Sequence, residues 1–132
     1  MDIKIKPQML RGEVKAIAAK ADGHRILIAS ALADGPTKIN IGTWSEDLDA
    51  TFNVLTRMGM GSRWHKDHVL TVWPIEEMPC TRTLDCGNSG STLRFLFPLA
   101  AALGCNGYTY TGSQRLGERP MQPLIVVMRS HG

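Results

Sequence analysis

The amino-acid sequence predicts an α+β fold made from one repeated supersecondary module. Short segments that alternate apolar and polar residues are interspersed with segments whose apolar residues recur at helical spacing. Their order is strand, helix, strand, helix, strand, strand, and the same order begins again at residue 81. We therefore expect one whole βαβαββ module over 19–80 and an incomplete second module over 81–132, preceded by N-terminal strands within 1–18.

The N-terminal third of the chain contains the first predicted strands and helix. Residues 2–6 and 12–17 alternate in polarity and are predicted strands. Residues 18–25 are predicted to form a loop. The segment 26–33 is apolar on nearly all sides, which predicts a buried helix, and Asp22 is a possible N-cap for it.

The rest of the first module follows from turn and cap signals. Residues 37–41 are a predicted strand, and the sequence from Thr43 to Glu46 fits a capping box. The apolar residues of the next segment have helical spacing and predict an amphipathic helix: Leu48, Phe52, Leu55 and Met58. Residues 62–66 and 68–73 are a predicted hairpin around Asp67.

The second module begins with a strand over 81–86 and a glycine turn. A helix is predicted over 91–103 and a strand over 108–111. A polar loop over 113–120 and a last helix over 121–129 complete the predicted elements.

Composition restricts the class of protein. The net charge of +3 is mild, and the sequence has no dense basic stripe or aromatic–basic interleaving, which argues against nucleic-acid binding. Three cysteines without CxxC spacing favour reduced thiols in the cytoplasm over disulfides or a zinc site, and no metal or cofactor set is apparent. The longest apolar run, 95–103, is too short to span a membrane.

The glycine turn over 87–90 is the most informative stretch for chemistry. It connects a strand to an apolar helix, and a helix start offers free N–H groups and the positive end of the helix dipole. Arg94 adds a fixed charge with a bidentate geometry. Together these features predict an anion site, although many glycine turns before helices bind nothing.

Other basic residues lie at two further junctions between loops and helices. One junction holds Lys20 and Arg25, and the other holds Arg115 and Arg119. A repeated module could bring these junctions to one end of the fold, where cations and helix starts suit phosphate and carboxylate groups. The alternative is that each is an ordinary solvated side chain.

Several other polar residues have a structural explanation that competes with a chemical one. We expect His24 to be structural and Cys86 to be a buried strand cysteine rather than a reactive thiol. The acidic residues near the start of the second helix are interpreted as helix-start charges and not as a catalytic pair: Glu46, Asp47 and Asp49.

The motifs together resemble the N-terminal part of the 5-enolpyruvylshikimate-3-phosphate (EPSP) synthase family. The stretch 85–94 is similar to its glycine-turn signature, 117–120 to its Glu-Arg-Pro motif, and 19–25 to its Lys–His–Arg segment. The resemblance implies a fold of the enolpyruvyl transferase type, an inside-out α/β barrel. It also implies transfer of the enolpyruvyl group of phosphoenolpyruvate to the 5-hydroxyl of shikimate 3-phosphate, without a cofactor.

The resemblance also assigns roles to residues. Lys20 would contact both substrates, and Arg25 would hold the carboxylate side of the shikimate ring. Gly90 and Arg119 would meet phosphoenolpyruvate, in a pocket shaped by Asn88 and Arg94. The chain departs from the family motif at Ala19 and Ala21, where serines are usual, and Asp22 places a negative charge near this corner.

Length is the larger departure from the family. The family enzyme has two domains with the active site between them, and the first strand of this chain would belong mainly to the other domain. The general base would also lie there, so we expect no catalytic residue within these 132 residues and no turnover by this chain alone. The whole enzyme is expected to be a cytoplasmic monomer that takes part in aromatic amino acid biosynthesis.

Two alternative functions remain open at this point. The related enolpyruvyl transferase that acts on UDP-N-acetylglucosamine shares the module, although the glycine-turn and Glu-Arg-Pro motifs favour the shikimate enzyme. A non-catalytic α+β module that binds RNA or a protein is the other alternative, and the confinement of basic residues to loop–helix junctions argues against it.

Overall fold

The structure is a computed structural model that describes all residues except 1–2, 5, 10, 80, 106 and 132. Its helices are α1 (Lys20–Ala31), α2 (Glu46–Arg57), α3 (Gly90–Ala102), α4 (Gln114–Gly117) and α5 (Gln122–Ser130). Its strands are β1 (Thr37–Asn40), β2 (Gly61–Trp64), β3 (Val69–Trp73), β4 (Thr81–Asp85) and β5 (Gly107–Thr111). The α+β class is confirmed, and the order of elements from α1 onward matches the prediction except for the additional short helix α4.

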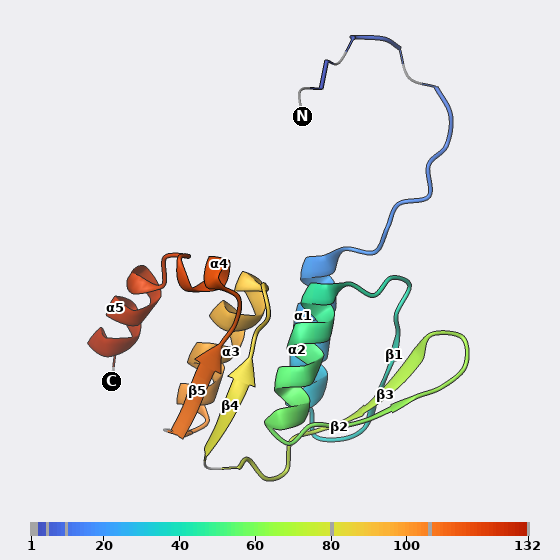
Figure 1. The fold of residues 1–132 in the computed structure, drawn as a ribbon. Helices are drawn as coiled ribbons and strands as arrows, with labels where there is room; N and C mark the ends of the chain where they lie inside the picture. Colours follow the sequence, from blue (N-terminus) through green and yellow to red (C-terminus); the bar gives the residue numbers. More distant parts are fainter. Residues whose placement is uncertain (1–2, 5, 10, 80, 106, 132) are drawn as a thin grey trace.

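The first unit is an antiparallel sheet covered by two helices. Its strand order is β1-β3-β2, and β3 pairs with both neighbours, with Leu70 opposite Ile39 on one side and Trp64 on the other. The predicted hairpin between β2 and β3 is confirmed, and its turn is made by Asp67 and His68, both at φ +59°. Helices α1 and α2 pack side by side against this sheet (Figure 1).

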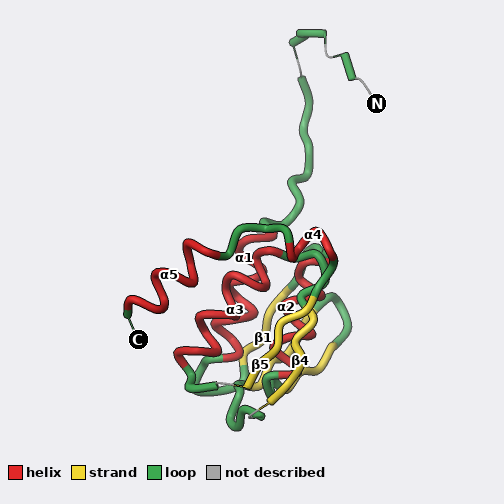
Figure 2. The backbone as a smooth tube through the Cα atoms, turned by 60° about the vertical axis from the view of Figure 1, so that its left-hand side comes forward, coloured by secondary structure: helices red, strands yellow, loops and turns green. Residues whose placement is uncertain are grey.

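The second unit is a parallel strand pair joined by a helix. Strands β4 and β5 pair in parallel with Leu84 opposite Tyr110, and α3 is the crossover between them. Helices α4 and α5 follow, and α5 leads away from the strand pair (Figures 1 and 2). The start of α3 lies beside the start of α2, where the Thr92 hydroxyl donates to the Asp47 carbonyl at 3.3 Å.

One continuous core joins the two units. Its members lie on the facing sides of α2, β3, β4 and α3, and include Val54, Leu55, Leu70, Leu84 and Leu96, all fully buried. Each such side chain contributes roughly 1.5–3 kcal/mol of transfer free energy. This packing fixes α2 against α3, which matters because both helices begin beside the site described below.

Helix α1 begins six residues earlier than the sequence predicts. Residues 20–25 were predicted as loop, yet Lys20, Ala21 and Arg25 are good helix formers, and the helix continues through them. A Cβ at Gly23 would lie 2.8 Å from Leu48 Cδ2, so glycine at this position allows α1 to pack closely against α2. The N-cap position is Ala19, which makes no side-chain cap, and the prediction that Asp22 is the N-cap is therefore wrong.

The predicted burial of this helix is correct for one side. The buried residues of α1 recur every three or four positions, as expected for a helix with a single packed face: His24, Leu27, Ser30 and Ala31. Ile26 on the other side is 47% exposed. The prediction of a helix buried all round is wrong because α2 and the sheet cover one face of α1.

Two smaller features also differ from the sequence prediction. The N-cap of α2 is Ser45, whose hydroxyl accepts a hydrogen bond from the Leu48 N–H at 3.3 Å, so the capping box that starts at Thr43 does not form. The polar loop 113–120 contains the short helix α4, which is capped by the Ser113 hydroxyl. In both places a serine one residue before the helix supplies the cap.

The N-terminal segment forms no strand in its described residues. Residues 3–4, 6–9 and 11–19 contain no helix or strand, and the segment extends from the start of α1 away from both sheets (Figure 1). Residues 2 and 5 of the first predicted strand lie outside the described residues. A strand needs a hydrogen-bonded neighbour, and the polarity pattern at 12–17 supplies none by itself. The division into the three ranges 1–18, 19–80 and 81–132 stays a prediction.

Candidate functional site

The starts of three helices border one polar cavity. The cavity has a volume of about 350 Å³ and is lined by Lys20 from α1, by the first turn of α2, by the glycine turn and the start of α3, and by Arg119. The complete set of lining residues is Lys20, Glu46, Asp47, Ala50, Gly87, Asn88, Ser89, Gly90, Ser91 and Arg119. Each of the three predicted loop–helix junctions therefore supplies at least one residue to this cavity.

The glycine turn is held by short-range hydrogen bonds. Asp85 Oδ1 accepts from the Gly87 N–H at 2.9 Å, and Gly87 has φ +54°, which favours glycine. The Ser89 N–H donates to the Cys86 carbonyl at 2.9 Å, and the Ser89 hydroxyl caps α3 by accepting from the Thr92 N–H at 3.2 Å. The N–H groups of the first turn before Thr92 have no acceptor within the helix, so they are available to an anion.

Two guanidinium groups lie over Gly90. A Cβ built on Gly90 would be 2.5 Å from Arg119 Nη1 and 2.7 Å from Arg94 Nη1. Arg94 is held in this position by donating from Nη2 to the Pro120 carbonyl at 3.3 Å. The absent side chain at Gly90 thus leaves the space in which both charges approach the start of α3, although Arg94 is not among the residues that line the cavity.

The ammonium group of Lys20 is paired with a carboxylate inside the cavity. Lys20 Nζ lies 2.6 Å from Asp47 Oδ2, and the two side chains are 53% and 32% exposed. The hydrogen bond from Lys20 is the main reason that the pKa of Asp47 is lowered; burial opposes this shift, and hydrogen bonding from the Ser89 side chain adds to it. A carboxylate therefore holds the lysine where a substrate anion is expected.

Sequence reasoning missed Asp47 as a site residue. Three acidic residues near the start of α2 look alike in the sequence, and a helix-start role accounts for all of them. In the structure Asp49 bonds with Trp44 and Asn53, whereas Asp47 faces Lys20, 27 positions away in the chain. The sequence does not show whether Asp47 or Asp49 faces Lys20, because that depends on how α2 packs against α1.

The other predicted site residues differ in their placement. Asn88 lines the cavity, and its Oδ1 accepts from the Ser113 hydroxyl at 3.0 Å, which ties the glycine turn to the start of α4. Arg25 does not line the cavity. It forms an exposed pair with Asp22 at 3.6 Å, so Asp22 acts on Arg25 rather than on the cavity. The structure thus brings together four of the six predicted residues around the cavity: Lys20, Asn88, Gly90 and Arg119.

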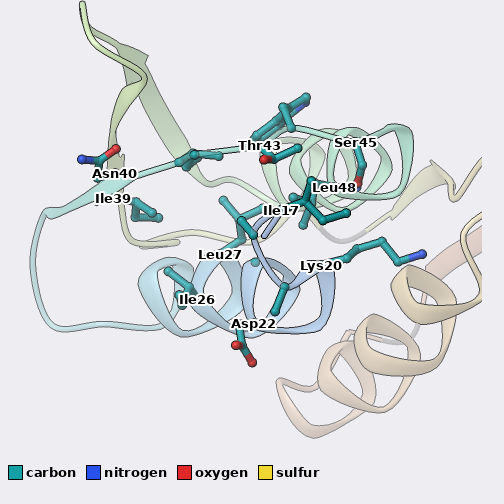
Figure 3. A pocket seen from close by; sticks show the side chains of 16 residues that line it. Ile17, Lys20, Asp22, Ile26, Leu27, Ile39, Asn40, Thr43, Ser45 and Leu48 are labelled. Atoms are coloured by element: carbon teal, nitrogen blue, oxygen red, sulfur yellow. The ribbon is translucent and has the colours of Figure 1, made fainter. Parts of the chain in front are cut away.

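A second, larger hollow is apolar and has a different chemistry. This groove, of about 560 Å³, lies between α1, β1 and the loop that leads to α2. In Figure 3 Ile17, Leu27 and Leu48 gather at its centre, and the Lys20 side chain extends away from them. The groove is therefore lined mainly by apolar side chains, whereas the polar cavity gathers Lys20 and Arg119 with the carboxylates of Glu46 and Asp47.

Three further findings concern the reactivity of Cys86, metal binding and membrane spans. Cys86 is buried at the end of β4, and burial raises the pKa of its thiol to about 11, which favours the unreactive form. Among the described residues, no three side chains of His, Cys, Asp or Glu gather as a metal site would require. No helix in the described ranges combines the length and apolar character needed to cross a membrane.

The fold and the cavity define a class of protein: an α+β repeat module with a polar cavity at converging helix starts. Comparison with known proteins supplies the family. A sequence model described as EPSP synthase (3-phosphoshikimate 1-carboxyvinyltransferase) matches residues 4–132. The chain belongs to the EPSP synthase family, as its motifs indicated.

Individual relatives agree with this assignment. The chain is 36% identical over 135 residues to 3-phosphoshikimate 1-carboxyvinyltransferase of Clostridium botulinum (strain Eklund 17B / Type B), covering 98% of this chain and 31% of the relative. It is 33% identical to the protein of the same name from Korarchaeum cryptofilum, again covering 98% and 31%. The solved EPSP synthase of Acinetobacter baumannii superposes with a TM-score of 0.75 at 25% identity, covering 90% of this chain and 28% of that one. The chain thus spans about a third of the length of these proteins.

Proposed function

We propose that this chain supplies one wall of the active site of a 3-phosphoshikimate 1-carboxyvinyltransferase. In that reaction the enolpyruvyl group of phosphoenolpyruvate passes to the 5-hydroxyl of shikimate 3-phosphate, and phosphate is released. Both substrates carry phosphate and carboxylate groups. A site for them needs several fixed donors and positive charges on one surface.

The polar cavity is the observation that carries this proposal. It joins Lys20 and Arg119 to the free N–H groups at the start of α3, with Arg94 directly behind Gly90. The resemblance in the glycine-turn signature covers the same residues. We propose that phosphoenolpyruvate meets Gly90 and Arg119, and that Lys20 contacts both substrates after an anion displaces Asp47 from it.

The role proposed for Arg25 requires that its side chain move toward the cavity, or that the substrate extend beyond the cavity to reach it. Its side chain is exposed beside Asp22, outside the cavity. We propose that Arg25 contacts the carboxylate side of shikimate 3-phosphate when that substrate extends from the cavity across the start of α1.

Binding of shikimate 3-phosphate tests the proposal directly. Titration calorimetry at low ionic strength should show binding, and Lys20→Met should weaken it about tenfold because one charge-assisted contact is lost. Lys38→Met, which removes an exposed lysine on β1, is the matched control and should leave the affinity unchanged. Equal affinities for the wild type and Lys20→Met would contradict the proposed role of Lys20.

Turnover is proposed to need groups from outside these 132 residues. The described residues of the cavity include two acidic side chains, Glu46 and Asp47, and the second of them is paired with Lys20. The family resemblance places the general base outside these residues, so a coupled assay for phosphate release should give no turnover with this chain alone. Clear turnover would show that the general base lies within it.

Two other functions give different results in the same experiments. Binding of UDP-N-acetylglucosamine in preference to shikimate 3-phosphate would favour the related enolpyruvyl transferase. RNA binding that weakens steeply with salt would favour a nucleic-acid-binding module. We propose neither, and we further propose that the whole enzyme acts in the cytoplasm as a monomer without a cofactor.

A further inference from the structure

A chain of buried hydrogen bonds connects α1, α2 and α3 directly behind the polar cavity. His24 Nδ1 lies 2.7 Å from Thr51 Oγ1, and Thr51 Oγ1 lies 2.7 Å from Thr92 Oγ1. The Thr92 hydroxyl also lies 2.7 Å from Ser89 Oγ and 3.3 Å from the Asp47 carbonyl. The side chains of His24, Thr51 and Thr92 are fully buried. The chain therefore links three helices through four polar side chains, and water does not compete for it.

The direction of this chain follows from counting protons. A carbonyl oxygen can only accept, and the bond to Ser89 also has Thr92 as its donor, so the single hydroxyl proton of Thr92 is directed toward the starts of α2 and α3. Thr51 must then donate its own proton to Thr92. No proton remains on Thr51 for the imidazole, so His24 Nδ1 is the donor of the first bond.

The other ring nitrogen of His24 supports the same tautomer. Nε2 is buried and has no hydrogen-bond partner among the described residues. A buried N–H without an acceptor is rarer in proteins than a buried acceptor without a donor. With the proton of neutral His24 on Nδ1, Nε2 is a buried acceptor without a donor, which costs less than a buried N–H without an acceptor.

We propose that His24 is a positioning residue whose Nδ1–H begins a one-way hydrogen-bond chain to the starts of α2 and α3. The chain ends at the Ser89 hydroxyl, which caps α3, and at the backbone of Asp47, whose carboxylate holds Lys20. It thereby fixes the two helix starts that form opposite sides of the cavity. This inference rests on the proposed function only in that it names the cavity as the substrate site.

The charges around His24 fit a neutral imidazole. Burial lowers its pKa most strongly; the nearby Lys20 lowers it further, and Asp47 opposes both. The remaining neighbour described for the ring is Phe95, which packs edge to face with a centroid distance of 6.2 Å and carries no charge. Removing Lys20 from Asp47 changes both of the charges that act on His24, so the occupancy of the cavity and the state of the imidazole are coupled.

Nitrogen-15 NMR of the imidazole ring tests the direction of the chain in the 132-residue protein. Long-range proton–nitrogen spectra at pH 7.5 distinguish the two neutral tautomers, and we expect the proton of His24 on Nδ1. A wild-type spectrum with the proton on Nε2 would overturn the proposal, whatever the protein binds.

Substitution of Thr92 tests the positioning role, because Thr92 is linked to His24 only through the hydroxyl of Thr51 in this chain of hydrogen bonds. In Thr92→Val the proton of Thr51 loses its acceptor and can turn to His24 Nδ1, so the tautomer should shift toward Nε2–H. The pKa of Asp47, followed by carboxyl carbon NMR, should rise as its helix start loosens. Thr92→Ser keeps the hydroxyl and should match the wild type, and Thr56→Val removes an exposed hydroxyl from α2 as the control.

The remaining outcomes separate this inference from the proposed function. Inorganic phosphate should bind Thr92→Val about twofold to thirtyfold more weakly than the wild type or Thr92→Ser. A folded Thr92→Val protein with unchanged tautomer and unchanged Asp47 titration would overturn the positioning role. The predicted tautomer in the wild type and the predicted Asp47 shift in Thr92→Val, found in a wild type that binds neither phosphate nor shikimate 3-phosphate, would overturn the proposed function and leave the chain of hydrogen bonds supported.

Discussion

Gly90→Ala should weaken anion binding while leaving the fold intact or slightly more stable. The added methyl group would lie 2.5 Å from Arg119 Nη1 and 2.7 Å from Arg94 Nη1, so both guanidinium groups must retreat by about 1 Å to reach ordinary contact. Both are the far ends of flexible side chains and can move. Gly90 begins α3 without a positive φ, so alanine gains up to about 1 kcal/mol in helix propensity.

The effect on binding follows from Coulomb's law. Moving one charge from about 4 to about 5 Å from an anion, at an effective dielectric of about 20, weakens their attraction by about 0.8 kcal/mol. Two such movements, about 1.6 kcal/mol together, weaken phosphate binding about fifteenfold. The contribution of each guanidinium can then be separated by repeating the titration with Arg94→Gln and Arg119→Gln.

Titration calorimetry with phosphate and urea unfolding measure the two quantities separately. Gly35→Ala is the matched control, because a methyl group there meets nothing within 4 Å and Gly35 does not line the cavity. Unchanged phosphate affinity in Gly90→Ala would show that the guanidinium groups do not act at the cavity. A stability loss above about 1 kcal/mol would show that the site is more rigid than argued.

Three further predictions concern stability and reactivity. Folding lowers the pKa of His24 below its ordinary value of 6.5, so the unfolded chain binds that proton more tightly. The free energy of unfolding should therefore fall as the pH drops below about 6.5. His24→Asn should flatten this pH dependence in urea titrations at pH 7.5 and 5.5. Leu55→Ala, at a fully buried position of α2, should cost about 2–5 kcal/mol in urea unfolding, whereas the exposed change Val126→Ala on α5 should cost less than about 1 kcal/mol. Cys86 should resist alkylation by iodoacetamide at pH 8 in the folded protein and react once urea unfolds it, because burial raises its pKa to about 11; rapid modification of Cys86 in the folded state would contradict this.

The local elements of this protein could be predicted where the sequence pattern is strong. The spacing of Leu48, Leu55 and Met58 predicts α2, and the polarity pattern around Asp67 predicts the β2–β3 hairpin. Helix α1 was predicted too short, because Gly23 and a weak apolar pattern hide its first two turns. The reason for Gly23 is its contact with Leu48, which belongs to another helix.

The candidate site, like the fold, was predicted only in part from the sequence. The sequence alone determined the α+β class, the glycine turn at the start of α3 and the basic residues Lys20, Arg94 and Arg119, because turn chemistry and charge are local properties. Only the tertiary structure decided that Asp47 holds Lys20, that Arg25 faces away from the cavity, and that His24 is joined to Ser89 through two threonines. The pairs Lys20–Asp47 and His24–Thr51 each join residues 27 positions apart, and Thr51–Thr92 joins residues 41 positions apart. These contacts depend on how the helices pack around a shared core, which no local pattern specifies.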